Sequence, residues 1–189
     1  MNRRCLRSAA GVAALLVSAL PWAEAVEYTE VNDTASTLSF TYYQMGSRVY
    51  GTFATFRGTL AFNTQDPAAS RAGLVIELGS IDAGSSDAND ELQKPAWFDT
   101  AAYPRATFQS TAVKALGNDR YLINGTLSLR GITRAVEVPV ILKSENAIGI
   151  FDGELILRRA DFKLGEGEWA DSFVSSEINI RFRMVAPEH

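Results

Sequence analysis

Few residues in this chain have side chains that could catalyse a reaction or hold a transition metal. The only histidine is His189, the last residue, and the only cysteine is Cys5, near the start. A serine nucleophile needs a neighbouring base, and redox metal sites draw on imidazole or thiolate ligands. The sequence therefore predicts no hydrolytic or redox activity, no metal site, no cofactor and no internal disulfide.

Carboxylates are the remaining reactive groups, and they gather in two segments, 82–91 and 161–171. The first lacks the sixth-position glycine and the terminal glutamate of a calcium loop, and helix capping explains its acids as well. The second is Gly-rich and is typical of a solvated loop, where a carboxylate has little catalytic value. We expect neither group to be catalytic. The residues considered are Asp82, Asp87, Asn89, Asp90 and Glu91, and Asp161, Glu166, Glu168 and Asp171.

Composition indicates an ordinary globular protein that does not bind nucleic acid. The 189 residues are 47% hydrophobic and 21% charged, with 18 basic against 22 acidic side chains and a net charge of −4. A nucleic-acid interface requires a basic surface, which this balance argues against.

The first 25 residues have the order of a secretory signal peptide. Arg3, Arg4 and Arg7 precede an apolar stretch over residues 9–20, and Ala23-x-Ala25 is a small-x-small cleavage site. We expect cleavage after Ala25, which leaves one exported domain over residues 26–189. Two alternatives are a retained amphipathic anchor and, from the paired arginines, a twin-arginine export signal.

The elements that must position any site are strands. Eight runs alternate one apolar with one polar face, over residues 37–42, 55–62, 74–78, 106–112, 120–129, 136–142, 151–157 and 174–184. Residues 87–94 are the exception, a short helix with Asp87 as N-cap. Pro139 predicts a strand edge or a bulge, and the aromatic cluster of Trp97, Phe98 and Tyr103 could close one end of the sheet. An all-β sandwich and a closed barrel both fit, and the long strands favour the eight-stranded antiparallel barrel.

The inward face of such a barrel is either a packed core or a lumen for one slender ligand. Burying ten methylene equivalents yields on the order of 8 kcal/mol, so an apolar tunnel could hold a hydrocarbon chain with little polar chemistry. The predicted lining is Phe40, Tyr42, Phe56, Leu60, Leu74, Ile76, Phe108, Tyr121, Ile123, Leu127, Val138, Val140, Leu155, Ile178, Ile180 and Phe182. Arg48 and Arg159 are head-group candidates, because each lies near the end of an apolar run and arginine makes strong charge-assisted bonds.

The order of several short motifs resembles the YceI-like family of bacterial periplasmic proteins. The motifs include Val49-Tyr50-Gly51-Thr52-Phe53, Tyr103-Pro104-Arg105-Ala106-Thr107-Phe108 and Arg159-Ala160-Asp161-Phe162. The resemblance covers residues 26–185 and departs from the pattern where many relatives have histidine and this chain has Ser36 and Gln44.

That resemblance implies a lipocalin-like barrel with a helical insertion that binds a polyisoprenoid or similar long-chain amphiphile in the periplasm. Quinone-like and fatty-acid-derived chains are further ligands of the same kind, and a membrane is a transient partner. The alternative is a filled-core barrel that acts as an interaction or stress-response module beside a membrane electron-transfer partner. Oligomeric state stays open.

Overall fold

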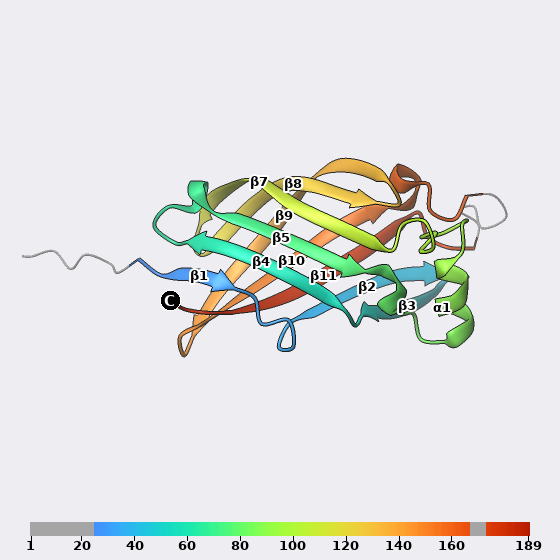
Figure 1. Ribbon diagram of the computed structural model, residues 1–189, viewed down its shortest axis with the longest axis horizontal. Coiled ribbons are helices and arrows are strands. Elements are labelled where there is room, and N and C mark those ends of the chain that lie inside the picture. Colours follow the sequence, from blue (N-terminus) through green and yellow to red (C-terminus); the bar gives the residue numbers. More distant parts are fainter. Residues whose placement is uncertain (1–24, 167–172) are drawn as a thin grey trace, which may run out of the picture.

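A computed structural model describes residues 25–166 and 173–189 (Figure 1). Within these ranges eleven strands form one antiparallel sheet, accompanied by one α-helix and three 3₁₀ helices. The elements are β1 Glu27–Glu30, β2 Thr37–Gln44, β3 Ser47–Phe53, β4 Phe56–Asn63, η1 Pro67–Ala69, β5 Arg71–Glu77, η2 Leu78–Ser80, β6 Ile81–Asp82, α1 Ser86–Gln93, β7 Arg105–Gly117, β8 Arg120–Leu129, β9 Ile132–Glu145, β10 Ile148–Arg158, η3 Arg159–Phe162 and β11 Glu177–Pro187.

The sheet curls into a lipocalin-like half-barrel. Its strand order is β1-β4-β5-β7-β8-β9-β10-β11-β2-β3-β6. An isolated bridge between Tyr28 and Glu188 brings β1 back to the segment that follows β11. In Figure 1, β1 and the C-terminus lie at one end of the half-barrel and α1 at the other.

The all-β fold with a helical insertion is confirmed, whereas the predicted number of strands is wrong. Each of the eight predicted runs contains a strand, but β1, β3 and β6 are additional. β3 and β4 are separate strands because the chain bends at Ala54 and Thr55, where the Ala54 amide donates to the Ser80 carbonyl over 3.1 Å. β1 and β6 have only four and two residues, which is too short for an alternating pattern to identify.

The predicted N-cap of the helix is wrong, whereas the predicted edge position of Pro139 is confirmed. The N-cap of α1 is Ser85 rather than Asp87, and the Ser85 hydroxyl accepts from the Ala88 amide over 3.2 Å. Pro139 faces Leu122 of β8, but β10 pairs with β9 only as far as Val140. Pro139 therefore lies on a local edge of β9. Because no described strand pairs with that edge, the sheet loses no hydrogen bond to the absent proline N–H.

Aromatic rings fill the end of the half-barrel near the termini. Phe62 packs edge-on against Tyr121 and Phe151 at centroid distances of 4.9 and 5.2 Å, and Tyr28 meets Phe151 at 5.3 Å. Edge-to-face contacts of this kind add to the stabilisation from buried area. These rings and their apolar neighbours form a core cluster separate from the larger one toward α1. We call this smaller cluster, which contains Tyr28, Phe62, Tyr121 and Phe151, the aromatic end.

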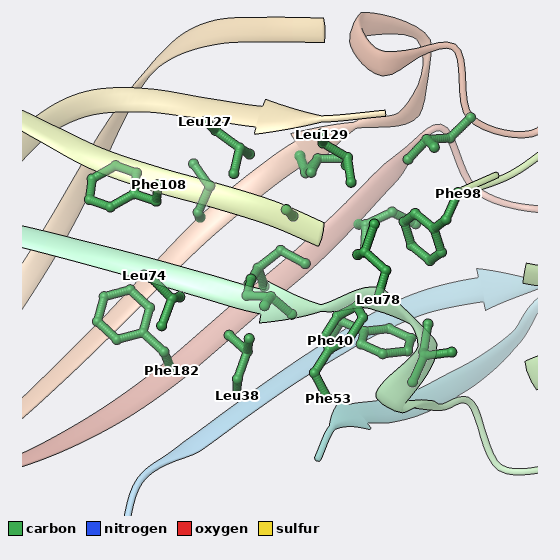
Figure 2. A pocket seen from close by; sticks show the side chains of 18 of the residues that line it. Leu38, Phe40, Phe53, Leu74, Leu78, Phe98, Phe108, Leu127, Leu129 and Phe182 are labelled. Atoms are coloured by element: carbon green, nitrogen blue, oxygen red, sulfur yellow. The ribbon is translucent and has the colours of Figure 1, made fainter. Parts of the chain in front are cut away.

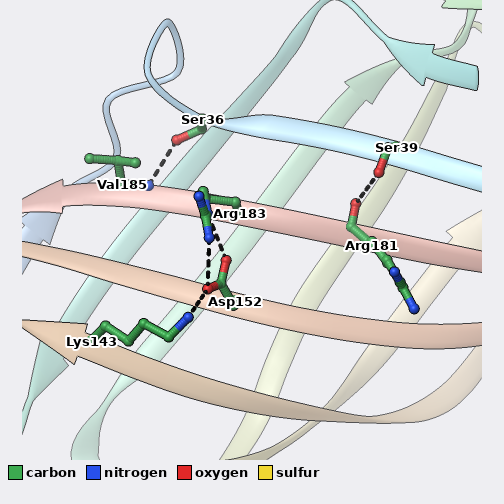
Figure 3. A network of polar contacts seen from close by, with 7 residues as sticks. All are labelled: Ser36, Ser39, Lys143, Asp152, Arg181, Arg183 and Val185. Atoms are coloured by element: carbon green, nitrogen blue, oxygen red, sulfur yellow. Dashed lines mark hydrogen bonds and ion pairs between the residues drawn. The ribbon is translucent and has the colours of Figure 1, made fainter.

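Charged and hydroxyl groups hold the outer face of β10 and β11 together (Figure 3). Asp152 accepts from Arg183 Nε over 2.8 Å and from Lys143 Nζ over 2.9 Å. Ser36, one of the positions that departs from the family pattern, is buried and accepts from the Val185 amide over 2.9 Å. The Ser36 hydroxyl therefore ties the loop before β2 to β11, a structural role that needs no histidine.

No helix among the described residues is long and apolar enough to cross a bilayer.

Candidate functional site

The half-barrel encloses a cavity of about 590 Å³ between the aromatic end and α1. Nearly every long strand contributes to its wall, and α1 covers part of one end. Figure 2 shows side chains from opposite walls converging on the same space, Phe40 and Leu38 from one side and Leu127 and Phe108 from another. The volume lies within the range typical of small-molecule sites. The arrangement is suited to a ligand rather than to a filled core.

Fourteen of the sixteen side chains predicted to line a lumen do line this cavity. Phe56 and Tyr121 do not, because Phe56 packs partly buried against the larger core cluster and Tyr121 belongs to the aromatic end. The fourteen are Phe40, Tyr42, Leu60, Leu74, Ile76, Phe108, Ile123, Leu127, Val138, Val140, Leu155, Ile178, Ile180 and Phe182. Their contact with a lipid stays a prediction.

The structure adds lining residues of two kinds. Leu38, Leu129 and Leu157 extend the same inward rows by two residues, so the alternation itself could have found them. Trp97 comes from a segment without any period, whereas Val174 begins the predicted run over residues 174–184 but precedes β11. Both are buried, and Trp97 lies at the α1 end, where an aromatic cluster was expected.

Glycines opposite inward phenylalanines help to keep the cavity open. Phe40 pairs across strands with Gly51, and Phe182 pairs with Gly153. A Cβ on Gly51 would lie 2.7 Å from Phe40 Cε2, and one on Gly153 would lie 2.6 Å from Phe182 Cε1. Real Cβ contacts are longer, so each ring occupies the space that a side chain would take on the neighbouring strand. The rings therefore lie along the wall instead of crossing the interior.

Polar groups of the cavity gather at the end covered by α1. Asp87 and Glu91, four residues apart on one face of α1, line the cavity together with Ser85 and with Gln44 at the end of β2. Burial raises the pKa of the Tyr42 hydroxyl, which also lines the cavity. One end of the cavity is thus polar and acidic, while the walls are apolar.

Arg159 lines the cavity, but its hydrogen bonds serve the loops of this end. Only 4% exposed, its guanidinium donates to the carbonyls of Ser175 over 2.8 Å, Leu164 over 2.7 Å and Val174 over 2.9 Å. Its Cζ lies 5.4 Å from the Trp97 ring centroid, within cation–π range. Arg159 therefore holds together the segments that flank η3.

The other head-group candidate, Arg48, is exposed on β3 and does not line the cavity. The two arginines are therefore not brought together at one site.

The two carboxylate segments form no metal site in the part of the chain that the structure describes, which contains no group of three acidic, histidine or cysteine side chains arranged for an ion. In the first segment, Asp82 accepts from the Gly84 amide and Asn89 from the Ala83 amide. These bonds stabilise the entry to α1. Glu168 and Asp171 lie outside the described residues, as do the arginines of the N-terminal segment.

Comparison with known proteins places the chain in a family. The family model described as YceI-like domain matches residues 30–186. The chain belongs to the YceI-like family. Among curated members, it is 38% identical over 117 residues to Protein YceI of Escherichia coli O17:K52:H18, covering 62% of this chain and 58% of that one. It is 37% identical over 99 residues to UPF0312 protein plu2095 of Photorhabdus laumondii, covering 52% and 49%. The chain spans about half the length of the curated relatives it matches.

Solved structures agree with this YceI-like fold. BcnA of Burkholderia cenocepacia superposes with a TM-score of 0.81 at 35% identity, covering 83% of this chain and 99% of BcnA. A polyisoprenoid binding domain of Saccharophagus degradans gives 0.65 at 21% identity, covering 87% and 98%. At that identity the second likeness concerns the fold alone.

Proposed function

We propose that this YceI-like chain is exported to the periplasm and carries one long-chain amphiphile, a polyisoprenoid or similar molecule, in its half-barrel cavity. The observation that carries the proposal is the cavity of about 590 Å³ with its apolar walls. The polyisoprenoid binding domain of similar fold supports the ligand class. A filled-core interaction module would have no need of such a space.

Apolar burial supplies enough free energy for this role. About ten buried methylene groups contribute on the order of 8 kcal/mol, which corresponds to a micromolar dissociation constant before ordering costs. A slender chain is favoured over a compact ligand because the walls come from ten strands and offer few polar partners. We infer a binding role rather than a catalytic one for the same reason.

The head group of the ligand is uncharged in this proposal. Asp87 lies where the cavity is polar and disfavours a phosphate by like-charge repulsion, whereas the Glu91 carboxylate is paired with Lys94 Nζ over 2.5 Å. Arg159 offers a cation there, but it donates to several loop carbonyls. A prenol, a quinone or a fatty amide fits this end, with Gln44 and Ser85 as hydrogen-bonding partners. Binding of a prenol and its phosphate with equal affinity would contradict this choice.

The decisive experiment combines native mass spectrometry with a chain-length series. Protein purified from the periplasm should retain added hydrocarbon mass, and the delipidated protein should bind alkyl and prenyl alcohols more tightly as the chain lengthens, up to an optimum. The mature N-terminus should be Val26, which N-terminal sequencing checks.

An Ile180→Trp variant tests the place of binding. Ile180 lines the cavity between Phe40 and Leu155, its cross-strand partners. A larger ring there should displace about three methylene groups, which costs roughly 2.4 kcal/mol or about 60-fold in affinity, and should shorten the optimal chain. Ile156→Trp is the matched control, because Ile156 is 57% exposed one strand away. Unchanged affinity in a folded Ile180→Trp variant would show that the ligand binds elsewhere than in this cavity. A clean apo mass with no binding would instead favour the interaction module.

A further inference from the structure

Four exposed apolar or aromatic side chains lie together at the α1 end of the half-barrel. Tyr43 is 55% exposed, Met45 72%, Tyr50 63% and Phe173 43%. Tyr43 and Tyr50 belong to β2 and β3, Met45 to the turn that joins these strands, and Phe173 to the segment before β11. We call these four residues the tip patch.

Backbone pairing sets the geometry of the tip patch. Tyr43 faces Arg48 across the hairpin and Tyr50 faces Thr41, so both tyrosines and Arg48 point to the same outer face. The Met45 amide donates to the Phe173 carbonyl over 2.9 Å, which fixes the turn beside Phe173. Backbone hydrogen bonds therefore fix the relative positions of the residues of the tip patch.

The tip patch and the cavity lie on opposite faces of the same backbone segments. Tyr42 and Gln44, the neighbours of Tyr43 in β2, both line the cavity, and so does Val174, the neighbour of Phe173. An isolated bridge joins Gln44 to Val174. The same backbone therefore presents its inner side to the ligand space and its outer side to the tip patch.

The hairpin turn contains a residue type that is unfavourable at this backbone conformation and at this exposure. Met45 has a φ of 51°, in the left-handed region that Asn and Gly adopt most readily at such turns. Its side chain is nevertheless the most exposed large hydrophobic one of the described residues. Tyrosine rings are enriched where proteins meet the membrane–water interface, because one edge is apolar and the hydroxyl is polar.

We propose that the tip patch docks on a lipid bilayer and that the ligand passes between bilayer and cavity at this end. The inference rests on the proposed function, since a water-insoluble chain needs a route that avoids water. Met45 and Phe173 would enter the acyl boundary, with both tyrosines at headgroup level and Arg48 near the phosphates. A lipid surface fits better than a protein groove because the patch sits at a hairpin tip and combines apolar, aromatic and cationic groups.

The test compares a patch variant with a matched control. The patch variant is Met45→Asn, Tyr43→Thr and Tyr50→Thr, and the control is Leu116→Thr, Ile141→Thr and Ile156→Thr, which are exposed apolar residues of other strands. Co-sedimentation with phosphatidylcholine vesicles, with and without phosphatidylglycerol, measures docking. Wild type and control should bind, and the patch variant should bind at least about tenfold more weakly. Met45→Asn alone restores a preferred turn residue and should weaken binding in a chain that folds normally.

A transfer assay separates docking from ligand binding. Dansyl-labelled geranylgeraniol is offered either in vesicles or from ethanol. The patch variant should take up probe from vesicles about tenfold more slowly, yet reach wild-type occupancy from ethanol. Equal transfer rates, absence of wild-type docking, or a wild-type dimer that the patch substitutions dissociate would each overturn the membrane proposal. Failure of every variant to bind probe from ethanol would instead refute the carrier function.

Discussion

Replacing Gly153 by alanine tests how the half-barrel keeps its interior open. Gly153 of β10 faces Phe182 of β11, and a Cβ there would lie 2.6 and 2.8 Å from Phe182 Cε1 and Cε2. Ordinary contact begins at 3.4 Å, so the ring must move by at least 0.8 Å. The wall blocks movement outward, and the displaced ring enters the cavity that it lines.

Two effects of opposite sign decide the stability of Gly153→Ala. Alanine in a strand gains roughly 0.5–1 kcal/mol over glycine from the entropy of the unfolded chain. Overpacking costs typically about 1–3 kcal/mol. The overlap is with an aromatic ring held between strands, so we expect overpacking to win and the variant to be destabilised by about 1–2 kcal/mol. The intruding ring should displace roughly one methylene group of ligand, about 0.8 kcal/mol or fourfold in affinity.

Urea denaturation and titration with a long-chain alcohol measure both effects, and Phe182→Leu supplies the second arm of a double-mutant cycle. In the Phe182→Leu background, Gly153→Ala should become neutral or stabilising, with a coupling energy above about 0.5 kcal/mol. Gly79→Ala is the control, since the nearest atom to its Cβ would lie at an ordinary 3.7 Å. Additive effects of Gly153→Ala and Phe182→Leu would refute the reasoning.

Three further substitutions probe the polar contacts. Arg159→Gln leaves buried carbonyls without donors and should cost about 3 kcal/mol in urea denaturation; a loss below about 1 kcal/mol contradicts that role. The pKa of Asp152 is lowered by hydrogen bonds from Arg183 and then Lys143, so its contribution is present above its usual pKa of 3.8 and is lost as pH falls through the lower folded value. Asp152→Asn should therefore destabilise the fold at neutral pH and progressively less below pH 3.8, whereas a pH-independent difference would exclude the carboxylate. Ser85→Ala should cost about 1 kcal/mol in thermal unfolding by removing the cap of α1, and no change would show the cap to be dispensable.

Alternation in the sequence predicts the strands because each long strand has one face inside and one outside. Leu127 and its neighbours in β8 alternate strictly between buried and intermediate positions. The same rule cannot detect β6, which has two residues and depends on pairing with Thr52 and Phe53 of β3. Nor can it select Ser85 over Asp87 as N-cap, because both residue types suit that position.

The lining of the cavity is predictable in the same way, but its emptiness is not. Whether Phe182 fills the interior or lies along the wall depends on Gly153, a residue 29 positions away that meets it only through strand register. Arg159 is similar, because its place near the end of an apolar run predicts a ligand contact. Its hydrogen bonds go to carbonyls of loops, and the sequence pattern does not show where these loops lie in the fold.

The two ends of the half-barrel differ in a way that would orient the chain proposed to bind there. Interlocked rings close the aromatic end, where Phe62 contacts both Tyr121 and Phe151 edge-on. An apolar tail would gain contact area against Phe151, the ring of this end that lines the cavity. A polar head placed there would lose its hydrogen bonds to water, which costs more than any single apolar contact returns. The head therefore belongs at the α1 end, beside Gln44 and Ser85, which is also the end from which the tip patch would reach a bilayer.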